Sequence, residues 1–194
     1  MQHEILAAML GHPGSLFGPS QIQNKSSIQK YNFECNPLAC SLLSQTEIAA
    51  VNRLIQYGGH VKFLREFVEK QSYMMDMRSA KSNCNRNSLY LRAVSSAVQK
   101  ILSSYESAVI ELERSLIKDP DLGVGFIYGK MELKIRWIPF LVELITAIDM
   151  KISPHDGSFQ ISTAKTVLEL VHNHVLLCGD EHVRTILQTI ESAW

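Results

Sequence analysis

One uninterrupted amphipathic stretch, from Ser88 to Asp119, limits the possible folds of this chain more than any other feature. Its apolar residues recur at three- and four-residue steps, which is the spacing of one face of an α-helix. They are Leu91, Val94, Val98, Ile101, Leu102, Tyr105, Val109, Leu112 and Leu116. No glycine or proline interrupts the stretch before Pro120. A helix of this length measures roughly 45 Å, so it needs several partners and indicates the central helix of a bundle.

Length and composition fit one globular domain. The 194 residues are enough for one hydrophobic core, and hydrophobic residues make up 46% of them. Lys plus Arg and Asp plus Glu both total 19, so no net charge draws the chain towards nucleic acid or an anionic membrane. The sequence contains no run of about 20 apolar residues, so no segment is expected to span a bilayer. We therefore expect neither nucleic acid nor a membrane among the partners.

The chain contains cysteines and histidines, but they are not spaced as in metal sites or catalytic sites. The cysteines are Cys35, Cys40, Cys84 and Cys178, and we expect reduced thiols in a cytosolic protein. Cys35 and Cys40 have no nearby histidine, which argues against zinc. His172 and His174 are two residues apart, so their rings lie on different helix faces. Because no phosphate-binding glycine pattern or nucleophile elbow occurs either, we expect no enzyme, metal or cofactor.

Shorter helical patterns lie on both sides of the central helix. Helical spacing and turn residues predict helices over about 2–10, 44–57, 61–73, 122–150, 161–176 and 180–190. The segment Ser44–Glu47 matches a capping box, and Gly58-Gly59 is expected to divide the helices on its two sides. Pro139 should bend or divide its own helix. The fold class is therefore all-α, an elongated stack of antiparallel helical bundles with about six or seven helices.

Three stretches lack helical periodicity. The longest, 18–43, is rich in Ser, Asn, Gln and Pro and is expected to be an irregular connection. The polar segments 78–87 and 151–158 are expected to be loops. The chain ends at Trp194 without a helix stop signal, which suggests that a longer protein continues beyond it.

Several short sequence fragments along the chain resemble motifs of one protein family. The central helix and its stop contain Tyr90-Leu91-Arg92-Ala93, then Tyr105, Leu112-Glu113 and Asp119-Pro120. The chain opens with MQHEILAAMLGHPGSLF and carries CGDEHVR at 178–184. The first set resembles the first Grip motif of the gamma-tubulin complex proteins. The opening is similar to the start of one component of that complex, and the last fragment resembles the family's Gly-x-x-x-Val-Arg stretch.

The resemblance implies a non-enzymatic scaffold subunit of the gamma-tubulin ring complex, which nucleates microtubules. Residues 1–194 would be a single N-terminal Grip-motif helical domain that contacts neighbouring complex components laterally. The C-terminal domain that would hold gamma-tubulin is absent, so the chain is expected to be truncated from a longer one. The implied location is the cytoplasm and cytoskeleton, at a centrosome, spindle pole or other microtubule-organising centre.

Two other classes of function stay open from the residues alone. One is a helical adaptor module that binds an amphipathic helix or peptide of an unrelated partner in a groove. The other is an enzyme, which would require a deep pocket with converging His, Glu or Cys side chains.

The candidate partner-binding residues are apolar side chains of the N-terminal segment. They are Ile5, Leu6, Met9, Leu16 and Phe17. A short helix and an apolar turn can lie on the outside of a bundle and present such side chains to a neighbour. The alternative, which the usual burial of these residue types favours, is a lid over the chain's own core. Tyr90, Arg92 and Tyr105 are expected inside, with the hydroxyls bonded to a neighbouring helix and the arginine paired with a glutamate.

Overall fold

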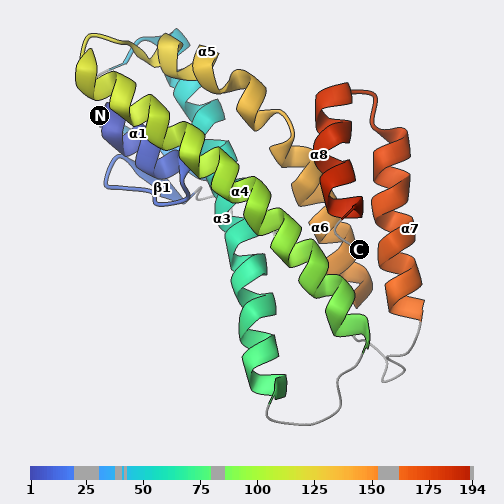
Figure 1. Ribbon diagram of the computed structural model, residues 1–194. Coiled ribbons are helices and arrows are strands. Elements are labelled where there is room, and N and C mark those ends of the chain that lie inside the picture. Colours follow the sequence, from blue (N-terminus) through green and yellow to red (C-terminus); the bar gives the residue numbers. More distant parts are fainter. Residues whose placement is uncertain (20–30, 38–40, 42, 80–85, 153–161, 193–194) are drawn as a thin grey trace. The chain divides into compact units, whose positions relative to one another are not determined.

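The described part of the chain is almost entirely helical (Figure 1). The structure is a computed structural model that describes residues 1–19, 31–37, 41, 43–79, 86–152 and 162–192. The helices are α1 (Gln2–Met9), α3 (Gln45–Ser79), α4 (Arg86–Lys118), α5 (Val124–Ile135), α6 (Ile138–Ile152), α7 (Ser162–Leu177) and α8 (Glu181–Glu191). Two short strands, β1 (Phe17–Pro19) and β2 (Phe33–Cys35), pair in one small sheet. The predicted all-α class is confirmed.

The chain divides into two compact units. Unit 1 comprises residues 1–63 and 102–138, and unit 2 comprises residues 64–101 and 139–194. Two of the boundaries fall inside the continuous helices α3 and α4. The expectation of a single elongated domain stays a prediction.

The predicted central helix is confirmed as α4, which has 33 residues and ends before Pro120. All the apolar residues that defined the stretch are buried, each at most 9% exposed. Arg92, however, was expected inside and is exposed, so this prediction is wrong. A step of one residue beyond the buried Leu91 turns a helical side chain by about 100°, which carries Arg92 out of the buried face. The side chain of Tyr90 lies outside the described residues.

The expected division at Gly58-Gly59 is wrong, because α3 is one helix of 35 residues that passes through both glycines. An ideal Cβ at Gly58 would overlap the carbonyl oxygen of Ala8 in α1. One at Gly59 would overlap the carbonyl oxygen of Tyr31. Two backbone segments therefore approach α3 so closely that only a hydrogen fits, and the glycines permit this contact instead of ending the helix.

The capping box at the start of α3 is confirmed. The Ser44 backbone N–H donates to Glu47 Oε2 at 2.9 Å, and the Ser44 hydroxyl donates to the same oxygen at 2.7 Å. In return, the Glu47 N–H donates to Ser44 Oγ at 3.4 Å. The hydrogen bonds from Ser44 lower the pKa of Glu47. The S-x-x-E pattern thus marked the helix start correctly.

The connection 18–43 was expected to be irregular. This expectation is wrong for part of it, because the connection contains most of β1 and all of β2. Phe17–Pro19 pairs antiparallel with Phe33–Cys35, in the register Phe17 to Cys35 and Pro19 to Phe33. The N–H of Cys35 also donates to Asn52 Oδ1 of α3 at 3.3 Å, which ties the strand pair to that helix. Strands of three residues are too short to show an alternating pattern. Residues 20–30, 38–40 and 42 lie outside the described part, as do 80–85 and 153–158 of the two predicted loops.

The predicted division at Pro139 is confirmed, because α5 ends at Ile135 and α6 begins at Ile138. Pro139 lies in the first turn of α6, where a missing backbone donor costs nothing. Trp137, between the two helices, is buried and meets the ring of Tyr105 edge-on, with ring centroids 6.4 Å apart.

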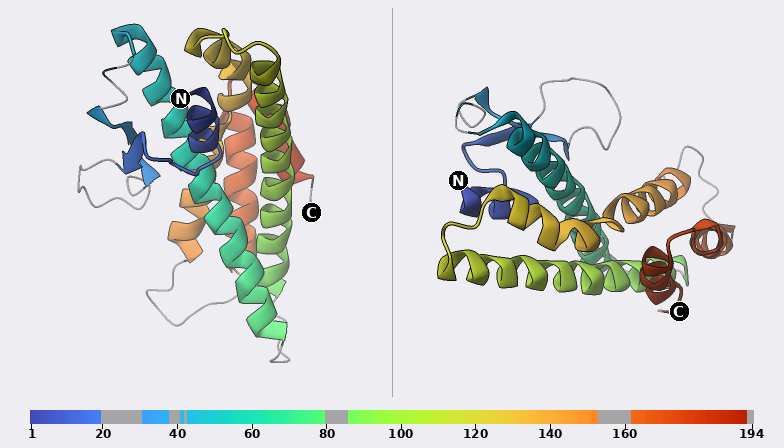
Figure 2. Two further views of the ribbon diagram at one scale, coloured as in Figure 1. Left: turned by 90° about the vertical axis from the view of Figure 1, so that its left-hand side faces the viewer. Right: turned by 90° about the horizontal axis from the view of Figure 1, so that it is seen from above.

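In unit 2, α7 and α8 lie side by side and are joined by a short capped corner (Figures 1 and 2). Asp180 Oδ1 accepts hydrogen bonds from the N–H groups of His182 at 3.0 Å and Val183 at 3.3 Å, which caps α8. The Arg184 guanidinium donates to the Cys178 carbonyl oxygen at 2.6 Å. The fragment CGDEHVR therefore has a structural use in this chain, because it closes the corner and starts the helix.

Candidate functional site

The five residues predicted to bind a partner all lie in unit 1, and four of them are buried. Ile5, Leu6 and Met9 of α1 and Phe17 of β1 are each at most 3% exposed, and Leu16 is half-buried. This placement agrees with the alternative interpretation, a lid over the chain's own core. Partner binding by these side chains stays a prediction.

Polar contacts fasten α1 to the middle of α4 and to the turn that follows this helix. The buried hydroxyl of Tyr105 donates to the Met9 carbonyl oxygen at 3.2 Å, so the predicted bond of this tyrosine to a neighbouring helix is confirmed. The side-chain amide of Gln2 donates to the carbonyl oxygens of Pro120, at 3.3 Å, and of Leu122. These contacts and the closely approached Gly58 hold α1 against α4, the turn after α4, and α3.

The turn after α1 is shaped by one glycine and one carboxylate. Gly11 has φ +84°, the left-handed conformation that commonly ends a helix and that other residues avoid. Glu4 Oε2 then accepts a hydrogen bond from the Leu16 N–H at 3.3 Å, which holds the following loop against α1. Together they direct Phe17 into the core of unit 1.

A half-buried imidazole follows the glycine pair of α3. His60 Nδ1 is buried and has no hydrogen-bond partner among the described residues. Its ring meets Tyr57 edge-on, with ring centroids 6.1 Å apart. Burial lowers the pKa of His60 from its ordinary value of 6.5, because a desolvated ring resists protonation. His60 is therefore neutral in the folded chain near pH 7.

The neutral state of His60 predicts a pH-dependent stability. Below pH 6.5 the unfolded chain binds a proton at His60 that the folded chain does not yet bind, so the free energy of unfolding falls as the pH falls towards the lowered folded-state pKa. Thermal melts between about pH 7.5 and pH 5.5 should show a loss that His60→Gln reduces. The exposed His182 supplies the control His182→Gln, which should leave the loss unchanged. An identical loss in the parent and in His60→Gln would contradict the prediction.

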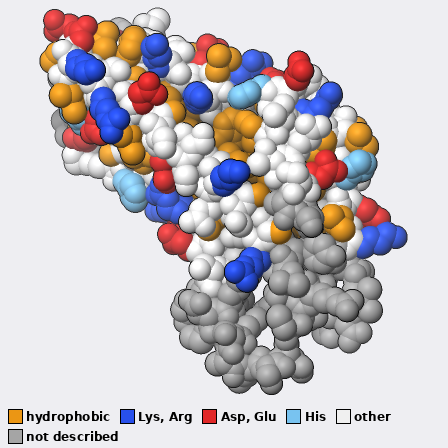
Figure 3. All heavy atoms as spheres, viewed as in Figure 1, with side chains coloured by type: hydrophobic (Ala, Val, Ile, Leu, Met, Phe, Trp, Pro, Cys, Tyr) orange, Lys and Arg blue, Asp and Glu red, His pale blue; other side chains and the backbone are white. Residues whose placement is uncertain are grey.

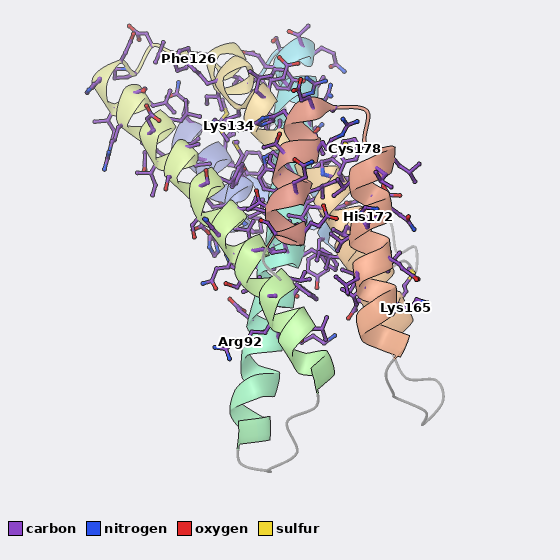
Figure 4. The ribbon with its side chains drawn as sticks, turned by 45° about the vertical axis from the view of Figure 1, so that its right-hand side comes forward. Arg92, Phe126, Lys134, Lys165, His172 and Cys178 are labelled. Atoms are coloured by element: carbon purple, nitrogen blue, oxygen red, sulfur yellow. The ribbon has the colours of Figure 1, made fainter. Side chains whose placement is uncertain are left out.

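The paired histidines of α7 have separate partners. His172 Nδ1 lies 2.8 Å from Glu191 Oε1 of α8, whereas His174 Nδ1 lies 2.9 Å from the Leu170 carbonyl oxygen of its own helix. The prediction that they lie on different faces is confirmed, and Figure 4 shows His172 on α7. In the part of the chain that the structure describes, no group of His, Cys, Asp and Glu side chains could hold a metal ion. Neither Cys35 nor Cys178 forms a disulfide with another described residue.

Nine large apolar side chains of the described residues are exposed, and two of them, Leu168 and Leu176, belong to the apolar pattern that predicted the helix over 161–176. In unit 1 they are Met1, Ile110, Ile117 and Leu133, and in unit 2 they are Phe140, Met150, Leu168, Leu176 and Leu177. Figure 3 shows groups of hydrophobic side chains on its visible face, with charged and polar ones between them. Isolated exposed apolar residues are normal in proteins, so they indicate a binding surface only where other features of the same face support it.

On the outer face of α5, other features accompany an exposed apolar side chain. The helical periodicity of apolar residues did not point to this face. It carries Gly125, Gly129 and Leu133 at four-residue steps, all of them exposed. The signal was available in the sequence, since two glycines four residues apart are unfavourable on a solvated helix. Separately, none of the described helices has both the length and the apolar character that crossing a bilayer requires.

Comparison with known proteins covers nearly the whole chain. A family model described as "Gamma tubulin complex component N-terminal" matches residues 3–193. Gamma-tubulin complex component 4 of Homo sapiens is 26% identical over 131 residues, which are 66% of this chain and 18% of that protein. A homolog of component 4 in Medicago truncatula is 27% identical over 156 residues, which are 77% of this chain and 21% of that protein. The component 4 of Arabidopsis thaliana is 27% identical over 173 residues, which are 77% of this chain and 23% of that protein.

Proposed function

Because this chain belongs to the gamma-tubulin complex component N-terminal family, we propose that it is part of a non-enzymatic scaffold subunit of the gamma-tubulin ring complex. The subunit stands beside other complex components and contacts them laterally through this N-terminal region. Its place in the cell is the cytoskeleton, at a centrosome or another microtubule-organising centre. The family match over residues 3–193 is the observation that carries the proposal.

The two long helices suit a subunit that stands beside similar subunits, because they are continuous and stiff. α3 and α4 are continuous over 35 and 33 residues, and each is hydrogen-bonded along its length as an α-helix. A lateral contact also needs helix faces that the chain's own core does not use. The exposed apolar side chains of α4 and α5 in unit 1 supply candidates for such faces.

Gamma-tubulin itself is expected to bind another part of the full-length protein. The chain spans about a fifth of the length of the curated relatives it matches. Residues 1–194 alone should therefore retain little gamma-tubulin in a pull-down, while they retain a neighbouring component.

A pull-down with the N-terminal halves of other gamma-tubulin complex components tests the proposed function. We expect residues 1–194 to retain at least one of these paralogues, because the lateral contact lies in this region. An unrelated helical bundle of similar size serves as the control bait and should retain none. If no paralogue binds, lateral assembly through this region is wrong, and the adaptor of an unrelated partner becomes the better interpretation.

A further inference from the structure

The face of α5 that points away from the core has an unusual composition for a solvated helix. Its buried residues are Val124, Ile127, Met131 and Ile135. At about 100° per residue, the opposite side of the helix is centred on Gly125, Gly129 and Leu133, with Phe126 beside them. Leu133 is 64% exposed, and Phe126 is half-buried.

Neither glycine is explained by contacts with the described residues. A Cβ at Gly125 or at Gly129 would meet no described atom within 4 Å, and neither residue has a positive φ. Each glycine in a helix interior costs about 0.5–1 kcal/mol relative to alanine. What the pair does provide is a stretch of bare backbone beside an exposed leucine, onto which another helix could pack closely.

The charged side chains at the two edges of this face differ in whether they have a partner of opposite charge. On one edge, Arg53 of α3 lies over the ring of Tyr128 at 5.8 Å, and Glu132 attracts the same guanidinium. On the other edge, Lys130 and Lys134 follow one another at a four-residue step and are both exposed. Lys130 lies over the Phe126 ring at 5.7 Å, and neither lysine has an ion pair among the described residues. Figure 4 shows Phe126 and Lys134 on α5.

We propose that this face of α5, formed by Gly125, Phe126, Gly129, Leu133 and the two lysines, docks an amphipathic helix with an acidic edge from a neighbouring complex component. Leu133 and Phe126 contact the apolar stripe of that helix, and the glycines let its backbone approach. Lys130 and Lys134 pair with its acidic edge, because unpaired cations beside an apolar stripe complement a helix of opposite charge. The inference rests on the proposed function and names the surface that it uses.

The test combines a steric variant with a charge variant in the chain 1–194. Gly125→Gln with Gly129→Gln introduces a good helix former at two open positions, so the melting temperature should rise by a few degrees. The same side chains block a close helix, so the affinity for the paralogue retained in the pull-down should fall at least about tenfold. Lys130→Glu with Lys134→Glu should also weaken binding, and the loss should be larger at low salt. Arg92→Glu with Lys100→Glu, on exposed positions of α4 in unit 2, is the matched charge control and should bind as the parent does.

The possible outcomes separate the two proposals. Weaker binding by a variant that is more stable than the parent supports docking on α5, since misfolding cannot explain it. If the unchanged chain binds a paralogue and both α5 variants bind equally well, this inference is overturned while the proposed function stands. If the glutamine variant loses stability, the glycines have an internal role and the inference is also overturned. If the unchanged chain binds no paralogue, both proposals fail.

Discussion

Replacing Gly58 by alanine is expected to lower the free energy of unfolding by about 3 kcal/mol or more, because overpacking against rigid atoms is costly. The added methyl group would overlap the Ala8 carbonyl oxygen and lie 2.7 Å from the Ala8 carbonyl carbon and 3.0 Å from Met9 Cα. All these atoms belong to the backbone of α1, so no side chain can move aside to relieve the contact. A loss of this size corresponds to a melting temperature lower by about 10 °C, measurable by circular dichroism.

Another helical glycine, with space for an added Cβ, provides the control. Gly129 is also helical, and a Cβ there meets no atom within 4 Å. Gly129→Ala should therefore raise the free energy of unfolding by about 0.5–1 kcal/mol, the intrinsic helical preference of alanine. Opposite signs for the two substitutions would show that the close approach of α1, and not helix propensity, makes Gly58 necessary. A stabilising Gly58→Ala would contradict the seating of α1 on α3.

The second large effect concerns the predicted partner-binding residues. Replacing Leu6 and Phe17 together by lysine is expected to lower the free energy of unfolding by about 4 kcal/mol or more, because both are core side chains. Each is 3% exposed, so the substitution removes apolar contacts and forces an ammonium group into a dry environment. Domains are stable by only about 5–15 kcal/mol, so much of the chain should unfold at room temperature in low urea. A urea titration followed by circular dichroism measures the loss.

The matched control uses two exposed isoleucines of α4. Ile110 is 45% exposed and Ile117 is 65% exposed, so Ile110→Lys with Ile117→Lys should change the stability by no more than about 1 kcal/mol in total. If the Leu6 and Phe17 variant instead melts close to the parent and no longer binds a paralogue, these side chains face a partner. The lid interpretation would then be wrong, and the original partner-binding hypothesis would be confirmed.

Much of the helical framework could be predicted, because its determinants are local. The burial of α4 followed from the three- and four-residue spacing of Leu91 to Leu116, and every one of those apolar side chains is buried. The capping box at Ser44, the stop before Pro120 and the division near Pro139 follow from backbone hydrogen-bonding rules that act within a few residues. The identity of the family was also accessible, since short fragments in order along the chain were enough to suggest it.

The candidate site was less predictable, because its determinants are contacts between distant segments. Sequence periodicity places Leu6 and Met9 on one face of α1, but it does not say whether that face meets the chain's own core or a partner. Both side chains are buried in unit 1, and the contacts that hold α1 there, such as the hydrogen bond from Tyr105 to Met9 and the close approach at Gly58, join residues far apart in the chain. The outer face of α5 was missed for a related reason, since an exposed leucine is informative only when its neighbours are known to be open.

The amino-acid sequence specifies where most helices begin and end, because caps, prolines and apolar spacing act over one or two turns. Packing across the fold instead decides the role of the glycine pair in α3, which would weaken an isolated helix and here admits α1 and Tyr31. It also decides which apolar residues are covered, as the buried Leu6 and the exposed Leu133 show. The physical reason is range: a helical turn is closed by residues four apart, whereas burial depends on which distant segment arrives to cover a face.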